Sequence, residues 1–308
     1  MDLAVIGLRW VQMMGAMILF GSSLFFVYAL PKTIAGLGGA LHWRMPLLRW
    51  AAAIVMATSV LGFLAQTVVL AGSVQDGLQI DALTAAAGMN LGLSTAARTG
   101  AGGLCLLVLS MMKPGRLAWW VCVTAGGIIC ASFAWMGHGA ASPGELGVLH
   151  TSSDVIHTLA AGAWIGALVG FLILLLTDRD RSVVGRNNLH AALSRFAGIG
   201  SGLVAVLIAT GLVNSWFLVG LSGLPTLLAT PYGQLLTIKL VLFIAMLGLA
   251  AANRFTLTPS LGRVLAEGSE VAPAVTSLRR SLLLETALSI GVIAVVALLG
   301  TLAPPMSL

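Results

Sequence analysis

Charged residues are scarce in this chain of 308 residues, because Asp, Glu, Lys and Arg together make up only 8% of it. A typical soluble domain carries about 25%, whereas 58% of this chain is hydrophobic. Cysteine is scarce as well: the three cysteines all lie in apolar stretches, so the sequence predicts no disulfide framework. A nucleotide-binding loop and a hydrolytic triad are also missing. The composition therefore excludes a soluble globular protein, and we expect no enzyme.

The apolar residues gather in eight stretches, each long enough to cross a bilayer as a helix of about 20 residues. They lie at residues 4–30, 48–72, 88–112, 118–137, 151–176, 198–220, 233–252 and 283–302. The stretches lack the alternation of a transmembrane β-strand, and in lipid only helices then satisfy the backbone. The sequence predicts an all-α polytopic membrane protein, a bundle of eight transmembrane helices in a single membrane domain over residues 1–308.

Basic residues fall on one side of this bundle. Thirteen of the 16 Lys and Arg residues lie in alternate loops, and the loops between them contain none. The positive-inside rule assigns the basic loops to the cytoplasm, so both the N and C termini are predicted outside, in the periplasm of a bacterial inner membrane. The net charge of +6 is explained by these loops and their contact with the lipid bilayer. We expect no nucleic-acid partner.

Glycine and proline suggest two local features. The longest predicted loop, 253–282, contains several of both, including Gly268, and this predicts irregular structure or a short helix there. In the fifth stretch Gly162, Gly166 and Gly170 recur at every fourth residue. Small residues at this spacing let helix backbones approach closely. We therefore expect this glycine face to pack against another helix.

Polar residues cluster between the fourth and fifth stretches. His138, His150, Asp154 and His157 fall within 20 residues at one membrane face. His150, Asp154 and His157 are spaced i, i+4, i+7, so they share one face of a helix. Imidazoles with a carboxylate suit copper or zinc, with Asp154 as a ligand or as the residue that orients a ligand. The alternative is that these groups cap helix ends and meet water at the interface.

Sulfur-containing side chains lie deeper in the predicted bundle. Met13 and Met17 are one turn apart in the first stretch, and Cys130 lies in the fourth. Thioether and thiolate sulfur favour Cu(I), so these residues are candidates for a relay below the histidines. Methionine is also common filler in apolar helices, and core packing is the alternative.

Other polar residues interrupt the apolar stretches. They are Arg98, Lys239, Glu285 and Asn214. Ionisable groups at such positions line cavities, pair with one another or extend to the interface. The sequence does not distinguish a transport role from a structural one for these residues.

Several short motifs resemble one known family. They are G-H-G-A at 137–140, D-V-I-H-T-L-A-A-G-A-W-I-G at 154–166, S-R-F at 194–196, T-G-L-V-N at 210–214, Y-G-Q-L-L-T-I-K at 232–239, N-R-F at 253–255 and R-R-S-L-L-L-E at 279–285. In this order, on eight stretches, they are similar to the copper resistance protein D (CopD) family of bacterial inner-membrane proteins. The resemblance is best over about 137–302.

This resemblance implies copper handling and copper homeostasis at the inner membrane, described for the family as uptake with a periplasmic copper carrier of CopC type. The family patterns fall on His138, Asp154, His157 and Trp164 of this chain. His150 and the sulfur positions do not follow from the resemblance in the same way. Because this chain contains no carrier-like domain, such a carrier is expected to be a separate protein.

Two other functions remain open at this point. A transmembrane electron carrier with haem b needs imidazoles facing each other between helices, which His138 and His157 are placed to provide. A copper sensor or docking subunit would bind metal outside without moving it. Metal analysis together with an optical spectrum of the purified protein distinguishes haem from copper.

Overall fold

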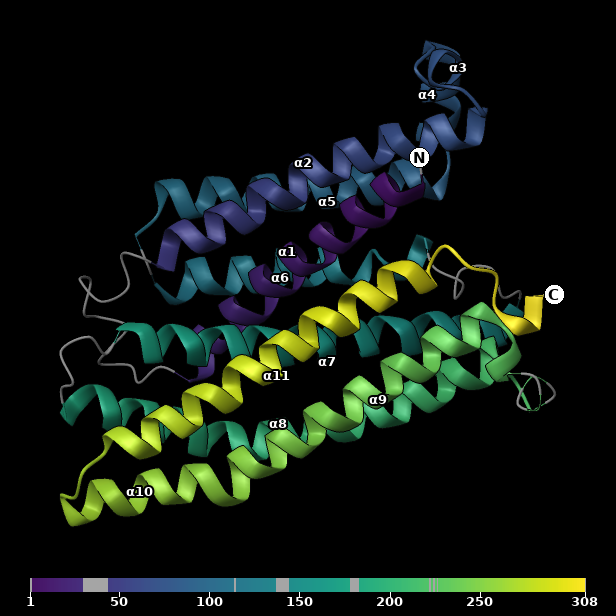
Figure 1. The fold of residues 1–308 in the computed structure, drawn as a ribbon. Coiled ribbons are helices and arrows are strands. Elements are labelled where there is room, and N and C mark those ends of the chain that lie inside the picture. Colours follow the sequence, from purple (N-terminus) through teal and green to yellow (C-terminus); the bar gives the residue numbers. More distant parts are fainter. Residues whose placement is uncertain are drawn as a thin grey trace.

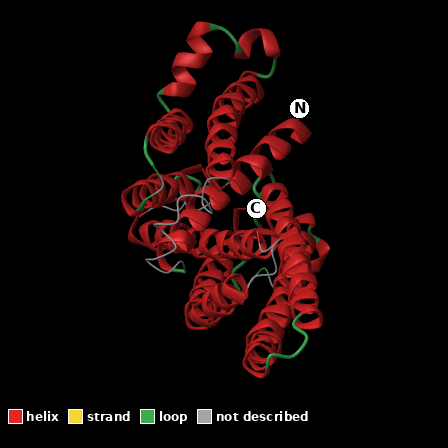
Figure 2. Cartoon of the chain, turned by 90° about the vertical axis from the view of Figure 1, so that its left-hand side faces the viewer, coloured by secondary structure: helices red, strands yellow, loops and turns green. Residues whose placement is uncertain are grey.

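The computed structural model describes residues 2–29, 44–113, 115–136, 144–177, 183–221, 223, 225 and 227–307. Every regular element in these ranges is a helix, as Figure 2 shows. Eight of the helices are long and apolar enough to cross a membrane. The predicted all-α fold with eight spans is therefore confirmed, whereas the assignment of the termini to the outside stays a prediction.

The eight long helices follow one another along the chain. They are α1 (Asp2–Tyr28), α2 (Arg44–Ala71), α5 (Asn90–Met111), α6 (Arg116–Ala131), α7 (Gly144–Thr177), α8 (Val183–Leu218), α9 (Pro231–Ala252) and α11 (Ala272–Leu299). The shorter elements are α3 (Val74–Gly77), α4 (Ile80–Ala87), η1 (Ala134–Met136), η4 (Leu227–Ala229), η5 (Asn253–Leu257), α10 (Thr258–Glu267) and η6 (Pro305–Ser307).

By their order along the chain the long helices fall into two sets, and the first set lies mostly above the second in Figure 1. We call α1, α2, α5 and α6 the N-terminal half, and α7, α8, α9 and α11 the C-terminal half. Helix α1 joins them, because it packs against α2 and α6 on one side and against α7 and α11 on the other. Both termini lie at the same end of the bundle in Figure 1, as an even number of spans requires.

The glycine face of α7 makes the closest contact between the halves. A Cβ atom on Gly166 would overlap the backbone of Gly21 and Ser22 in α1, and one on Gly170 would overlap the ring of Phe25. On Gly162 it would lie 3.0 Å from the ring of Phe20, also in α1. The predicted packing of this face against another helix is confirmed, and α1 is that helix.

Of the irregular structure or short helix expected over 253–282, only the short helix is confirmed, as α10, because helices fill most of this segment. Helix α9 continues through the π-helical turn η5 directly into α10, and α11 begins at Ala272. Proline stands in the first turn of both α10 and α11, where its missing N–H costs nothing. Gly268 ends α10 with φ of 65°, a left-handed conformation that favours glycine. The residues that suggested a loop are helix boundaries.

The sixth span is also longer than predicted. It was expected to begin near residue 198, but α8 begins at Val183 and has 36 residues. At 1.5 Å per residue this exceeds the roughly 30 Å of a hydrocarbon core. Its first turns therefore extend beyond the core, and polar residues there do not interrupt the helix.

Candidate functional site

The polar face of α7 lies against α8. The ring of His150 stacks on Phe217, with centroids 4.6 Å apart and an interplanar angle of 8°. One helical turn further along α7, Asp154 accepts a hydrogen bond of 3.5 Å from the side-chain amide of Asn214. As α7 ascends from 150 to 154, its partners on α8 descend from 217 to 214, so the two helices run antiparallel in matched register.

His157 continues this register, and its hydrogen bond defines which ring nitrogen is free. Its Nδ1 lies 2.9 Å from Oγ1 of Thr210. The same hydroxyl donates to the backbone carbonyl of Val206 at 2.6 Å, so its proton is already used. Nδ1 of His157 must then be the donor, which assigns the proton to Nδ1 and leaves the lone pair on Nε2. Nε2 is the nitrogen that is available to bind a metal ion or accept a proton.

A cavity of about 270 Å³, which we call the His157 cavity, adjoins this ring. It lies between α7, α8, α9 and α11, and its lining includes His157, Trp164, Lys239, Met246 and Ser289. The rest of the lining is almost entirely aliphatic or aromatic. The cavity therefore offers one imidazole, one thioether and one ammonium group within an apolar enclosure.

Positive charge surrounds the carboxylate of Asp154. Arg9 in α1 and Lys239 in α9 both interact electrostatically with this carboxylate. Arg9 also donates a hydrogen bond of 3.1 Å to the carbonyl of Gly300, which follows α11. Asp154 thus exerts a favourable electrostatic influence on both basic side chains, and Asn214 donates a hydrogen bond to it from α8.

The four predicted metal ligands are not united in the part of the chain that the structure describes. His138 lies outside the described residues. Within them, no group of three or more His, Cys, Asp or Glu side chains is arranged to hold a metal ion. His150 and His157 are seven residues apart, about 10 Å along the axis, and each faces a different residue of α8. The four-residue site therefore stays a prediction.

The sulfur-containing candidates lie in the core. Met13, Met17 and Cys130 are 5%, 2% and 0% exposed and belong to one apolar cluster. Met17 faces the glycine of α7 at Gly162, where α1 and α7 meet. These contacts agree with core packing, and the relay role stays a prediction.

Arg98 is enclosed within the N-terminal half. Its guanidinium donates to Oγ and to the carbonyl of Ser132, at 2.8 and 3.0 Å, and to Oε1 of Gln12 at 3.1 Å. It also lies over the ring of Phe133, 4.4 Å from the centroid. These partners connect α5 with α1 and with the end of α6, which indicates a structural role.

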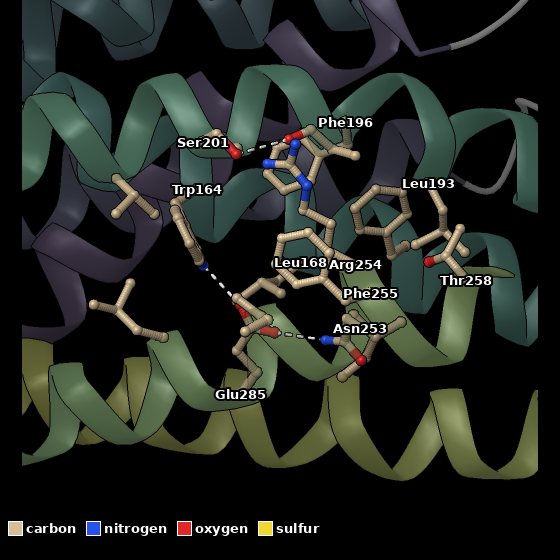
Figure 3. A pocket seen from close by; sticks show the side chains of 18 residues that line it. Trp164, Leu168, Leu193, Phe196, Ser201, Asn253, Arg254, Phe255, Thr258 and Glu285 are labelled. Atoms are coloured by element: carbon tan, nitrogen blue, oxygen red, sulfur yellow. Dashed lines mark hydrogen bonds between the residues drawn. The ribbon is translucent and has the colours of Figure 1, made fainter.

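Glu285 forms a second polar centre, shown in Figure 3. Its Oε1 accepts a hydrogen bond of 2.8 Å from Nε1 of Trp164, and its Oε2 accepts one of 2.9 Å from Nδ2 of Asn253. A cavity of about 320 Å³, the Glu285 cavity, adjoins these residues and Arg254. The sequence singled out Glu285, and the family resemblance singled out Trp164, but neither indicated that the two meet; Asn253 lies in a quoted motif and was not singled out.

The described histidines lie in three separate places. The ring of His150 stacks on Phe217, and the ring of His157 is hydrogen-bonded to Thr210. The ring of His190 lies against Gly262 of α10, where a Cβ atom would be 2.6 Å from it. The predicted pairing of His157 with His138 for haem involves a residue outside the described ranges.

Comparisons with known proteins agree on one family. The family model described as "Copper resistance protein D" matches residues 190–299, and "Copper resistance protein D-like, N-terminal domain" matches residues 1–148. The first falls within the C-terminal half, and the second covers the N-terminal half. No solved structure matches the chain.

Three curated relatives are similar in sequence. Copper resistance protein D of Pseudomonas syringae pv. tomato is 34% identical, with 98% of this chain and 97% of the relative covered. Inner membrane protein YebZ of Escherichia coli K12 is 28% identical, with 97% and 98% covered. Copper transport protein CutJ of Bacillus subtilis 168 is 30% identical, over 56% of this chain and 28% of the relative. With eight apolar helices, these likenesses identify a multi-pass inner-membrane protein.

Proposed function

The chain belongs to the copper resistance protein D family, and on that premise we propose that it takes copper from the periplasmic side into the membrane through the His157 cavity. Copper is the cargo, and His157 is its first ligand inside the bundle. His138 and His150 are the ligands that copper meets before it, nearer the predicted outer face. A separate periplasmic carrier of CopC type is the proposed donor.

The hydrogen bond between Nδ1 of His157 and the hydroxyl of Thr210 is the observation that carries this proposal. Because that hydroxyl donates to the carbonyl of Val206, we assign the ring proton to Nδ1 and the free lone pair to Nε2. A hydrogen bond on the distal nitrogen is the usual way in which proteins orient a metal-binding imidazole. The ring lines a cavity within the membrane span, where a polar side chain is costly unless it is used.

The charges around the cavity favour Cu(I) over Cu(II). Two basic side chains, Lys239 and Arg9, stand against the single carboxylate of Asp154. The electrostatic cost of adding a metal ion rises with the charge of the ion, so a monovalent ion is admitted more readily. Met246 also lines the cavity and offers a soft thioether sulfur. We therefore expect a reductant to be required for uptake.

Copper binding to detergent-purified variants tests the proposal. His157→Ala should abolish tight binding of Cu(I) in the His157 cavity. Thr210→Val keeps the side-chain shape but removes the oxygen that orients the imidazole, and should weaken affinity about 10–100-fold. His190→Ala, at the other end of α8, is the matched control and should bind as the wild type does. Full stoichiometry and affinity in His157→Ala would overturn the assignment.

Transport is tested separately in proteoliposomes. We expect wild-type protein to move Cu(I) in the presence of a reductant and His157→Ala to move much less. Wild-type protein that binds copper but moves none would replace uptake by the sensor or docking function.

A further inference from the structure

Glu285 is a carboxylate in the middle of a membrane-spanning helix. It lies 13 residues after the start of α11 and is 2% exposed. Its two hydrogen-bond donors, the indole of Trp164 and the amide of Asn253, are both neutral. Neither donor supplies a counter-charge, and an isolated carboxylate at such a depth costs several kcal/mol. The copper site proposed above does not use this residue.

Asn253 contributes a second oxygen next to this carboxylate. Its side chain is 8% exposed, and its Oδ1 has no hydrogen-bond partner among the described residues. A buried polar atom without a partner is uncommon and calls for an explanation. Asn253 also begins the π-helical turn η5, and π turns in helices are frequent at functional sites.

The ionisable groups near Glu285 are few. The elements packed against α11 contribute the following described ionisable side chains: Arg9 and Tyr28 from α1, His150, Asp154 and His157 from α7, Tyr232 and Lys239 from α9, Arg254 from η5, and Arg263 and Glu267 from α10. Of these, only Arg254 lines the Glu285 cavity. Its guanidinium lies 5.1 Å from the ring centroid of Phe255.

We propose that Glu285 and Asn253 form a reversible proton-binding site at the Glu285 cavity. In the ionised state, Oε2 accepts the Nδ2–H of Asn253, as the structure shows. On protonation, one proton joins Oε2 and the charge of the carboxylate is lost. The amide of Asn253 then turns by half a rotation, so that the new O–H donates to its Oδ1. The Nε1–H bond from Trp164 to Oε1 is kept in both states.

A proton fits this site better than a metal ion does. Hard cations such as Mg²⁺ and Ca²⁺ take six or more oxygen ligands, whereas the described side-chain oxygens that line this cavity come from four residues, Glu285, Asn253, Ser201 and Thr258. The hydroxyl of Ser201 already donates to the carbonyl of Ala197. Copper prefers imidazole and sulfur. The N–H groups of Trp164 and Asn253 already face the two carboxylate oxygens, and their positive ends would repel a metal ion.

Trp164 connects this site with the copper cavity. Its side chain lines both the His157 cavity and the Glu285 cavity. A copper ion held by His157 would disfavour a proton on Glu285, because like charges repel across a medium of low dielectric constant. By linkage, protonation of Glu285 would weaken copper binding by the same factor. This coupling rests on the proposed function, whereas the proton site itself does not.

Infrared difference spectroscopy of protein reconstituted in phospholipid vesicles tests the proton site. Lowering the pH should produce the C=O band of one buried carboxylic acid in the wild type, and Glu285→Gln should lack that band. Glu267→Gln, which removes an exposed carboxylate of α10, is the matched control and should keep it. Asn253→Leu and Trp164→Phe, which each remove one hydrogen bond, should shift its frequency.

Three results would overturn the proton site. They are the absence of a titrating buried band in the wild type, an undiminished band in Glu285→Gln, and a band that disappears on adding Na⁺ at constant pH, which would assign the site to sodium. If Glu285→Gln does not fold, an unshifted band in both Asn253→Leu and Trp164→Phe would overturn the proton site.

Copper tests the coupling. With Cu(I) bound, the band should disappear at a pH lower by about one unit, and His157→Ala should abolish this shift. An unchanged midpoint with copper bound at His157 would overturn the coupling alone. Loss of copper binding or flux with an intact band would overturn the proposed function alone.

Discussion

The two halves of this protein contain similar intramembrane polar groups but surround them differently. In the N-terminal half, Arg98 is 5% exposed and its guanidinium is saturated by Ser132, Gln12 and an aromatic ring. The cavity beside it measures only about 30 Å³. In the C-terminal half, His157 and Glu285 adjoin cavities of about 270 and 320 Å³. Free volume therefore adjoins the polar groups of the C-terminal half, as the proposed uptake requires.

The packing of the helices explains this difference. In the candidate spans of the N-terminal half, between 28% and 56% of the residues are buried, whereas the values for α8 and α9 of the C-terminal half are 11% and 6%. Helices α8 and α9 are therefore peripheral, and the spaces between them and α7 are not filled by a further helix. In the N-terminal half, both α1 and α5 pack against α2 and α6.

The largest expected effect comes from the contact that joins the halves. Gly166→Leu should destabilise the protein by about 3 kcal/mol or more, because its side chain would overlap the backbone of α1. Gly202→Leu in α8 is the matched control, since a Cβ there meets no atom within 4 Å. Thermal unfolding in detergent measures both. Equal stability of the two variants would show that α1 and α7 are not in close contact.

A smaller loss of stability is expected inside the N-terminal half. Arg98→Met leaves the acceptors on Ser132 and Gln12 unpaired, which should cost about 1–3 kcal/mol. Copper affinity should not change, because this residue is structural. Arg263→Met, at an exposed position of α10, is the control. If Arg98→Met instead lost copper and kept its stability, the contrast between the halves would fail.

In the C-terminal half, a single charge should tune copper affinity. Lys239→Met removes a cation from the lining of the His157 cavity, and Cu(I) should bind about fivefold more tightly, an effect on the order of 1 kcal/mol. Lys113→Met, in a loop residue that is exposed, should leave affinity unchanged. Weaker binding in Lys239→Met would mean that this residue supports the site instead of opposing the ion.

The smallest structural change tests whether the N-terminal half carries copper at all. Met13→Leu with Met17→Leu conserves volume and should alter stability by less than about 1.5 kcal/mol. If these sulfurs form the relay, Cu(I) flux in proteoliposomes should slow while copper still binds at His157. Equal flux in the double variant and the wild type would remove the methionines from the route and confine it to the C-terminal half.

Sequence reasoning identified the eight spans and misjudged their ends. The spans follow from apolar length, which a single sequence displays directly. The extent of the helices through 253–282 was underestimated because Gly268 and the two prolines, which are also typical of loops, mark helix boundaries here. Of the site, the shared face of His150, Asp154 and His157 was correctly predicted from spacing, since helical periodicity is a local property.

The sequence by itself determined that this protein is an integral membrane protein and that it is helical. It also singled out the few polar groups that interrupt the apolar stretches. Those conclusions depend on composition and on periodicity within one segment. Only the tertiary structure decided that Thr210 orients His157, that Trp164 and Asn253 hold Glu285, and that Arg98 is enclosed. Such pairings join residues 32 to 121 positions apart. They depend on how helices rotate and slide against each other, which no local pattern of residues specifies.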